Sequence, residues 1–242
     1  MLLSKLVYFC IKNAVFYDDS AFTYEAFLQG KYDSDPDYAT NIHNIYSPLN
    51  MAISRLNDLD RLPFAINSVT SDSNSFSVAS FKDNIKEIMG VAAFYQGSIR
   101  PLNYVYANNL DTIRVISDLY PEEEVKVEYK RNIPYFVNYK DAILNGDWIT
   151  GEVFFHYEKH QNLTTGNDVW EKTADPDMAD YGVNDGMANY IIEYVKGCLL
   201  EPIDAHLAVM HLNRAESYFN NLPVQEGAFR QRNTEAIYRI GE

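Results

Sequence analysis

Near its C-terminal end the chain contains two stretches in which apolar residues recur at helical spacing. The first places one apolar face over Met187, Ile191, Tyr194, Val195 and Cys198, as an amphipathic helix does. The second repeats the pattern with Ala208, Leu212, Ala215, Phe219 and Leu222. Because only a short turn separates the two stretches, residues 184–222 are predicted to form an antiparallel helical hairpin.

Residues at the ends of the two helices, and in the interface between them, are also consistent with a hairpin. Asn184 or Asp185 can cap the first helix through a side-chain oxygen. Pro202 suits the first turn of the second helix, because the N–H that proline lacks is unused there. Ala208 and Ala215 are small enough to let a partner helix approach closely.

Two more helical patterns lie nearer the N-terminus. The first is a single apolar stripe made of Leu3, Leu6, Val7, Cys10 and Ala14. The second begins at Ser47 and Pro48, continues on one face, and stops before Pro63; its apolar face consists of Leu49, Ile53 and Leu56. The stretch 17–46 mixes aromatic residues with Asp, Ser and Pro, which predicts irregular surface structure apart from one short helical turn.

The middle of the chain changes from helical spacing to alternation, which is typical of strands. One segment sets Val125, Val127 and Tyr129 against Lys126, Glu128 and Lys130, and so predicts a half-buried strand. Another sets Val153, Phe155 and Tyr157 against Phe154, His156 and Glu158. A polar run over 71–75 predicts a turn before a strand at Phe76 and Val78, and 175–185 predicts a polar linker.

These patterns together predict a mainly α protein with a β-rich insertion, an α+β fold in which a helical bundle is closed by the C-terminal hairpin. We expect a single domain over residues 1–222. Its helical core comprises residues 1–65 and 184–222, and the β-containing insertion covers about residues 70–180. Residues 223–242 are predicted to form an extended C-terminal arm.

The arm combines large apolar residues with positive charge in an otherwise acidic chain. Its candidate partner-binding residues are Phe229, Arg230, Arg232, Ile237, Tyr238, Arg239 and Ile240. A tail of this kind is a frayed terminus, a segment that folds back on its own domain, or an arm that reaches a neighbour. We favour a docking arm, because solvated tails rarely carry several large apolar residues.

Composition restricts the class of protein. The chain has 242 residues, of which 47% are hydrophobic, so it can bury a proper core. Its net charge of −14 argues against recognition of nucleic acid or of anionic membranes by affinity. The apolar run 6–11 is far shorter than the roughly twenty residues of a membrane span. We expect a soluble protein made in cytoplasm, with Cys10 and Cys198 as free thiols on apolar helix faces.

The histidines nearest to a metal-binding pattern are His156 and His160, which flank Glu158. On a helix this spacing would place both imidazoles on one side. The local alternation predicts a strand instead, where residues four apart share a face but lie too far apart to bind one ion. A metal site is therefore not favoured here.

A second candidate site is the alternation of Asp33, Asp35 and Asp37, which matches the opening of a calcium loop. Tyr38 stands where that loop needs glycine, and Asn44 stands where it needs glutamate. The chain also lacks a Gly-rich phosphate loop, a nucleophile elbow and a Cys–His pair. We therefore predict no catalytic, metal-binding or cofactor-binding residues, and a protein that is not an enzyme.

The order of these elements resembles the head-to-tail adaptor, or connector, proteins of tailed bacteriophages. Segments 185–195 and 208–219 are similar to the closing hairpin of those proteins. The acidic composition, rich in Asn and Tyr, resembles that of short-tailed phages of the crAss-like group. The long segments 17–46 and 100–180 depart from the shortest members of the family.

The resemblance implies a structural virion protein of the neck or tail, assembled in the host cytoplasm. It implies a homo-oligomeric ring of about twelve copies between the portal protein and the tail or further ring proteins. DNA would pass through the ring without specific binding, and no membrane partner is implied. Family adaptors grip the portal with a terminal extension, and in this chain residues 223–242 would have that role.

Two other classes of function stay open from the residues alone. One is a non-catalytic binding protein for glycan or protein partners; a glycan-handling protein of the cell surface would require export, which the N-terminus argues against. The other is a hydrolase whose site is assembled from scattered carboxylates among the 34 acidic residues.

Overall fold

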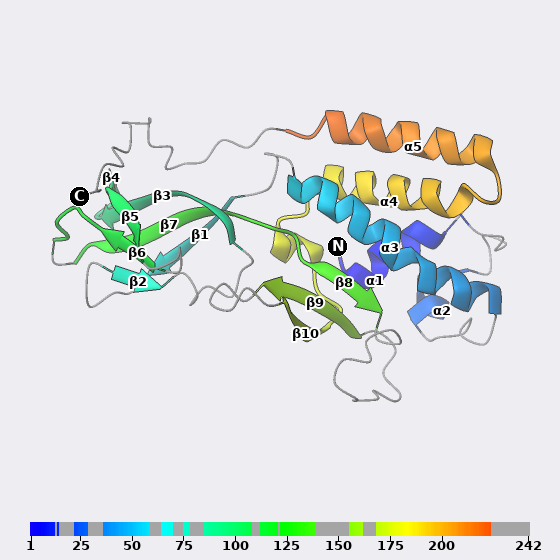
Figure 1. The fold of residues 1–242 in the computed structure, drawn as a ribbon, viewed down its shortest axis with the longest axis horizontal. Helices are drawn as coiled ribbons and strands as arrows, with labels where there is room; N and C mark the ends of the chain where they lie inside the picture. Colours follow the sequence, from blue (N-terminus) through cyan, green and yellow to red (C-terminus); the bar gives the residue numbers. More distant parts are fainter. Residues whose placement is uncertain are drawn as a thin grey trace, which may run out of the picture. The chain divides into compact units, whose positions relative to one another are not determined.

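A computed structural model describes residues 1–12, 14, 22–28, 36–58, 64–69, 75–77, 85–107, 112–120, 122–138, 155–161 and 168–223. The chain divides into two compact units (Figure 1). The described residues of the first unit come from 1–62, 133–161 and 167–224, and those of the second come from 63–132. The predicted helical core and part of the predicted insertion thus share the first unit.

The predicted fold class, mainly α with a β-rich insertion, was wrong. The described residues combine five α-helices with strands in three antiparallel sheets, so the fold is mixed. One of these sheets lies in the same unit as the helices. Alternation had revealed only two segments of strand, since five of the ten described strands have only three or four residues, too few for a period of two to be recognised. No helix in the described ranges is both long and apolar enough to cross a membrane.

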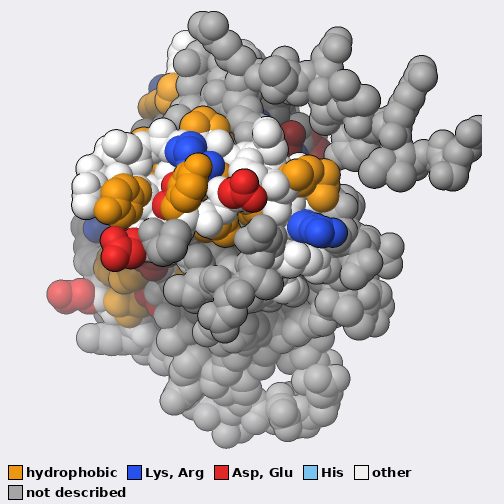
Figure 2. Space-filling model, turned by 90° about the vertical axis from the view of Figure 1, so that its left-hand side faces the viewer, with side chains coloured by type: hydrophobic (Ala, Val, Ile, Leu, Met, Phe, Trp, Pro, Cys, Tyr) orange, Lys and Arg blue, Asp and Glu red, His pale blue; other side chains and the backbone are white. Residues whose placement is uncertain are grey.

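The second unit consists of strands. They are β1 (Phe64–Val69), β2 (Ser75–Ser77), β3 (Ile85–Tyr95), β4 (Ser98–Pro101), β5 (Tyr104–Ala107), β6 (Thr112–Val115) and β7 (Glu124–Arg131). One sheet has the order β1-β7-β3-β4 and the other has the order β2-β6-β5. Their shared core includes Val91, Ile113 and Val127. Figure 2 shows that apolar side chains on one side of the molecule stand among basic and acidic ones.

Strand β7 forms where alternation predicted it, but its second face is not solvated. Val125, Val127 and Tyr129 are buried as expected. Glu128 and Lys130 on the opposite face are only 1% and 6% exposed. The prediction of a half-buried strand was therefore wrong at these two positions. β7 pairs with both β1 and β3, and a central strand is shaded from both sides.

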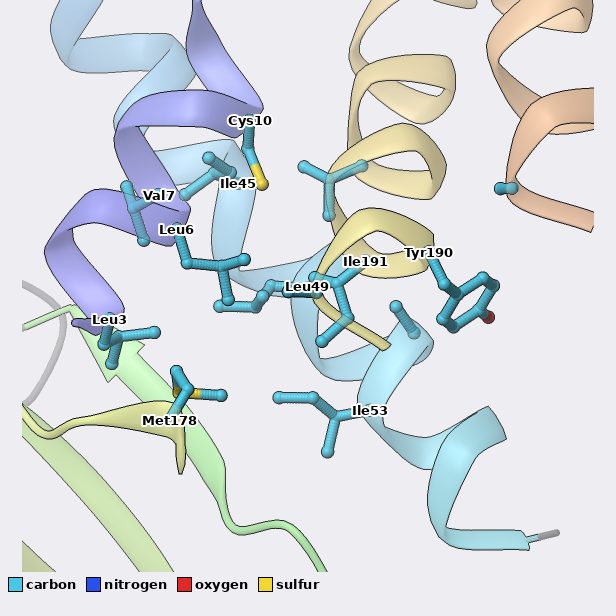
Figure 3. Packing of buried hydrophobic residues seen from close by; sticks show 14 of the residues in the cluster. Leu3, Leu6, Val7, Cys10, Ile45, Leu49, Ile53, Met178, Tyr190 and Ile191 are labelled. Carbon is cyan, nitrogen blue, oxygen red and sulfur yellow. The ribbon is translucent and has the colours of Figure 1, made fainter. Parts of the chain in front are cut away.

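The helices that the structure describes all lie in the first unit. They are α1 (Leu3–Ile11), α2 (Tyr24–Leu28), α3 (Pro36–Asp58), the short 3-10 helix η2 (Met178–Tyr181), α4 (Asp185–Leu200) and α5 (Ala205–Asn220). Helix α4 is central, since it packs against α1, α3 and α5. Figure 3 shows Leu6 of α1, Leu49 of α3 and Ile191 of α4 converging in the core of this unit.

Helix α3 is longer than its pattern predicted. The predicted start at Ser47 and Pro48 was wrong, because the helix begins at Pro36 and Pro48 lies inside it. A proline within a helix lacks one backbone hydrogen bond, but packing can offset this cost. The predicted apolar face is confirmed, since Leu49, Ile53 and Leu56 are fully buried.

The stretch 17–46, predicted to be irregular, also contributes to the core. Helix α2 and the first turns of α3 lie within it. Phe22 and Phe27 are buried, and the Phe22 ring stacks on that of Tyr8 with 5.2 Å between centroids. The aromatic residues that suggested a surface loop are therefore packing against α1. Asp33 and Asp35 lie outside the described residues, and Asp37 belongs to α3.

The sheet of the first unit has the order β10-β9-β8, with β8 (Tyr135–Asn138), β9 (Phe155–Gln161) and β10 (Asp168–Ala174) all antiparallel. Strand β9 contains His156, Glu158 and His160, which confirms the predicted strand for this segment. Val153 and Phe154 lie outside the described residues.

Two asparagines bind α3 to β8 and to the residues just before it. Asn57 Nδ2 donates to the Ile133 carbonyl oxygen and Ile133 N–H donates to Asn57 Oδ1, both at 2.8 Å. Asn50 makes the same pair of bonds with Phe136, at 2.7 and 2.9 Å. Each amide therefore satisfies two backbone groups as a neighbouring strand would.

The predicted linker 175–185 is in fact part of the packed unit. Ser4 N–H and Ser4 Oγ donate to the two carboxylate oxygens of Asp175, at 2.8 and 2.6 Å. Met178 in η2 is buried in the helical core. Asp175 therefore satisfies a free N–H in the first turn of α1 from a distant part of the chain.

Candidate interaction site

The predicted C-terminal hairpin is confirmed and forms the most regular part of the first unit. Helices α4 and α5 are joined by residues 201–204 and pack along each other. Asn184 caps α4 as predicted, since its Oδ1 accepts from the Met187 N–H at 3.0 Å. The second predicted start was wrong, because α5 begins at Ala205 and Pro202 lies in the turn.

The cap of α5 is Asp204, a residue that the sequence patterns had not singled out. Its Oδ1 accepts from the N–H groups of His206 and Leu207, at 3.0 and 3.1 Å. A carboxylate satisfies two free N–H groups of the first turn and suits the positive end of the helix. This cap fixes where α5 begins.

The seam between α4 and α5 is tight because small residues face it. A Cβ atom placed on Gly197 would lie 2.6 Å from Leu212 Cγ. Ala208 and Ala215 are buried in the same seam. The predicted close approach at the two alanines is confirmed, and the helix that approaches is α4.

Two polar contacts hold α5 against the rest of the unit. His211 Nδ1 lies 2.8 Å from Glu193 Oε2 on α4. Arg55 on α3 donates from both terminal nitrogens to the carboxylate of Glu216, and its guanidinium lies 4.1 Å from the centroid of the Phe219 ring. These contacts fix the rotation of α5 about its own axis, and so determine which of its residues point outward.

The charged and aromatic groups at this contact shift one another's acidity. Hydrogen bonding to Arg55 lowers the pKa of Glu216, and Glu216 in turn raises the pKa of Arg55. Burial raises the pKa of Tyr190 to about 12, while the nearby Arg55 opposes the rise. The Tyr190 ring lies 4.9 Å from that of Phe219. All three groups therefore serve packing between helices in the charge states that they have at neutral pH.

One flank of α5, beside this seam, exposes apolar side chains. Only three of its 16 residues are buried. The exposed set runs from the turn along one side of the helix: Ile203 at 46%, Leu207 at 38%, Met210 at 37% and Tyr218 at 42%. Arg214 lies among them at helical spacing and is also exposed. We call these five residues the outer face of α5.

This surface offers hydrophobic contact and one cation. No protein-family model matches the chain, and no curated protein is similar to it in sequence. Within the described ranges, no group of three or more His, Cys, Asp or Glu side chains is placed to hold a metal ion. The outer face of α5 thus presents four apolar side chains and the guanidinium of Arg214.

A second exposed group lies in the second unit, near the β3–β4 turn. Its apolar members are Tyr95, Ile99, Ile116 and Tyr120. Arg100 bonds to Glu123, which lowers the pKa of that carboxyl, and stacks over the Tyr120 ring at 5.0 Å. Charged side chains thus stand among the apolar ones here, as Arg214 does on the outer face of α5.

The predicted partner-binding residues do not enter this description. Phe229, Arg230, Arg232, Ile237, Tyr238, Arg239 and Ile240 all lie outside the described residues. The outer face of α5 was missed at the level of sequence. The sequence could have indicated it, because the apolar residues Leu207 and Met210 lie on the side of the helix that was predicted to face solvent.

Proposed function

We propose that this chain is a non-catalytic structural protein that forms an oligomeric ring between the portal and the tail of a tailed bacteriophage, extends the DNA channel and docks tail components. The observation that carries the proposal is the outer face of α5. It exposes four apolar side chains along a helix that buries only three of its 16 residues within its own chain.

The energetics of this face favour assembly. An isolated exposed apolar residue is normal on a protein surface, whereas several in register along one helix mark an interaction site. Leu207 and Met210 are 38% and 37% exposed, so covering the remaining surface of each contributes roughly 0.5–1 kcal/mol. In a closed ring each subunit makes such a contact with two neighbours.

The charge of the chain supports a role as part of a channel. At −14, the protein has little attraction for phosphate backbones. A ring lined by carboxylates would let DNA slide, whereas a basic lining would hold the DNA through phosphate contacts.

The titratable groups at the hairpin support a structural role over a catalytic one. Arg55 is engaged with Glu216 and His211 with Glu193. Each pair joins two helices, so each carboxylate already has a packing function. A catalytic acid or base must instead face a site where substrate can reach it.

The test is to purify the full chain alone and together with the portal protein of the same genome. Light scattering coupled to size exclusion measures the assembled mass, and negative-stain images reveal rings. We expect ring-shaped particles and a complex with portal. A chain that stays monomeric at high concentration and does not bind portal would contradict the proposal, as would turnover of a small molecule abolished by changing one carboxylate.

A further inference from the structure

We propose that the second unit is a module inserted into the first, that it opens and closes as a cooperative unit of its own, and that the Asn57–Ile133 pair stops this opening from spreading into β8 and the helices. The inference does not depend on the proposed function. It concerns a device built into the fold, in which one part of the chain unfolds locally while the rest keeps its structure.

The two units have separate hydrophobic cores. The core of the first is formed by the helices together with η2 and the start of β8. The core of the second includes Val91 of β3, Ile113 of β6 and Val127 of β7. Among the described residues, no buried side chain belongs to both cores. Each unit therefore has its own buried apolar surface, which a separate cooperative transition requires.

The two ends of the proposed module lie side by side. Strand β1, the first strand of the second unit, pairs antiparallel with β7, the last. This pairing places Phe64, the first residue of β1, opposite Lys130, which is next to the last residue of β7. A segment whose ends meet can be inserted into a host domain without separating the two points at which it joins that host.

On the side of the first unit, Asn57 joins the same two stretches of chain. Its side-chain amide donates to the Ile133 carbonyl oxygen and accepts from the Ile133 N–H, both at 2.8 Å. Asn57 is 8% exposed and Ile133 is fully buried, so water has little access to these bonds. Because Ile133 follows the end of β7 by only two residues, the boundary between the units falls within this short stretch.

The Asn57–Ile133 pair has the position of a stop. Strand β7 is followed directly by β8, so an opening of β7 would otherwise run along the chain into β8. At Ile133 it meets two backbone groups held by α3 and a side chain buried in the first core. The 76 positions from Asn57 to Ile133 then form a closed loop. The cost of closing a loop grows only slowly with its length, so the first unit can keep its fold.

The experiment measures amide hydrogen exchange of the full chain by mass spectrometry. Peptides from β3 and β7 report on the second unit, and peptides from α1 and α4 report on the first. Two matched variants each truncate a fully buried valine, Val127→Ala in the second core and Val195→Ala in the first. Each should speed exchange in its own unit about tenfold or more and change the other unit by about twofold or less. If either variant speeds both units by the same factor, the chain opens only as a whole and the proposal is wrong.

Low concentrations of urea give a second readout that needs no substitution. In the unchanged chain, exchange in the two units should rise with urea along two different slopes, because each opening exposes a different amount of surface. One common slope with one common free energy of opening would overturn the proposal, even if Val127→Ala failed to fold.

A comparison of backgrounds tests the stop at Ile133. In the unchanged chain, the peptide covering residues 133–138 should exchange with α4, and adding Val127→Ala should not speed it. In an Asn57→Ala background, Val127→Ala should speed exchange of this peptide about tenfold, because opening of β7 can now reach β8. The matched background is Asn44→Ala, an exposed residue of α3, in which no response is expected. A response in the unchanged chain, or none in Asn57→Ala while α4 stays protected, would refute the stop.

Discussion

Arg55 of α3 donates two hydrogen bonds to the carboxylate of Glu216 of α5. The longer of the two joins Nη2 to Oε2 at 2.8 Å. Its guanidinium also covers the ring of Phe219 at 4.1 Å. Since α5 otherwise packs mainly on α4, this one side chain links the outermost helix to the third helix of the unit. The outward orientation of Leu207 and Met210 depends on that link.

Replacing Arg55 by Leu, or Glu216 by Gln, should lower the free energy of unfolding modestly. The two side chains are 39% and 47% exposed, so solvent screens their attraction and the pair contributes about 1 kcal/mol or less. Arg55→Leu should cost more than Glu216→Gln, because it also removes the contact with Phe219. Chemical denaturation of both variants and of the double variant measures the coupling energy. A coupling of zero would mean that the pair is only a surface contact.

The same pair predicts a dependence of stability on pH. Arg55 lowers the pKa of Glu216 below its ordinary value of 4.5. The stabilisation is therefore fully present above pH 4.5 and is lost as the pH falls through the lowered pKa of the folded state. The difference in unfolding free energy between the unchanged chain and Glu216→Gln should shrink over that acidic range. Denaturant titrations at several pH values check this, and a difference that grows on acidification would contradict it.

The parts of the fold that follow from regular periodicity could be predicted from the sequence. The stripe of Leu3, Leu6 and Val7 forms α1, and the two stripes near the C-terminus form the hairpin with Asn184 as its cap. Each depends on neighbours within one helix, where a repeat of 3.6 residues gives the buried face directly. Structure that depends on neighbouring residues in the sequence can thus be predicted from the sequence.

The parts that could not be predicted depend on distant partners. Ser47 and Pro48 resemble a helix start, but α3 continues through them because its apolar face is packed on both sides of the proline. Asn50 and Asn57 look like surface residues, yet their partners are backbone groups 86 and 76 positions away. Nothing local distinguishes such an asparagine from a solvated one.

The candidate site shows the same division. The sequence predicted an adhesive arm at 223–242, which lies beyond the described residues except for Pro223. It did not predict the outer face of α5. Which apolar residues of α5 stay exposed depends on how the helix packs against α4 and Arg55, and this packing is not visible in the sequence. Ala208 and Ala215 are buried, whereas Leu207 and Met210 are exposed.

Gly197→Ala should destabilise the hairpin although alanine favours helices. The new Cβ would lie 2.6 Å from Leu212 Cγ and 3.2 Å from the Ala208 carbonyl oxygen. Overpacking of this kind costs roughly 1–3 kcal/mol, which outweighs the gain of about 1 kcal/mol in helix propensity. Adding Leu212→Ala should recover part of the loss, since it removes the atom in contact. If Gly197→Ala raised the melting temperature, the seam would be looser than described.

The two thiols should differ in reactivity. Cys10 is fully buried, and burial raises the pKa of its thiol. Cys198 is half-buried; burial raises its pKa too, while a hydrogen bond to Tyr194 opposes the rise. A thiol-specific reagent near pH 8 should label Cys198 slowly and Cys10 only after denaturation. In Cys198→Ser no labelling of the folded protein is expected, and equal rates for both thiols would contradict this account.

Asn57→Ala should be among the most destabilising single changes outside the apolar core. The substitution leaves the N–H and carbonyl of Ile133 without the partners that the buried amide supplies at 2.8 Å. Each buried polar group left without a hydrogen-bond partner lowers the free energy of unfolding by about 1–3 kcal/mol. Asn57→Asp should also destabilise, because it keeps the acceptor but sets a carboxylate against the Ile133 carbonyl oxygen. The matched control is Asn44→Ala, an exposed asparagine on the same helix, which should change the unfolding free energy by about 0.5 kcal/mol or less. Equal effects at the two positions in urea denaturation would show that the tie between α3 and β8 contributes nothing to stability.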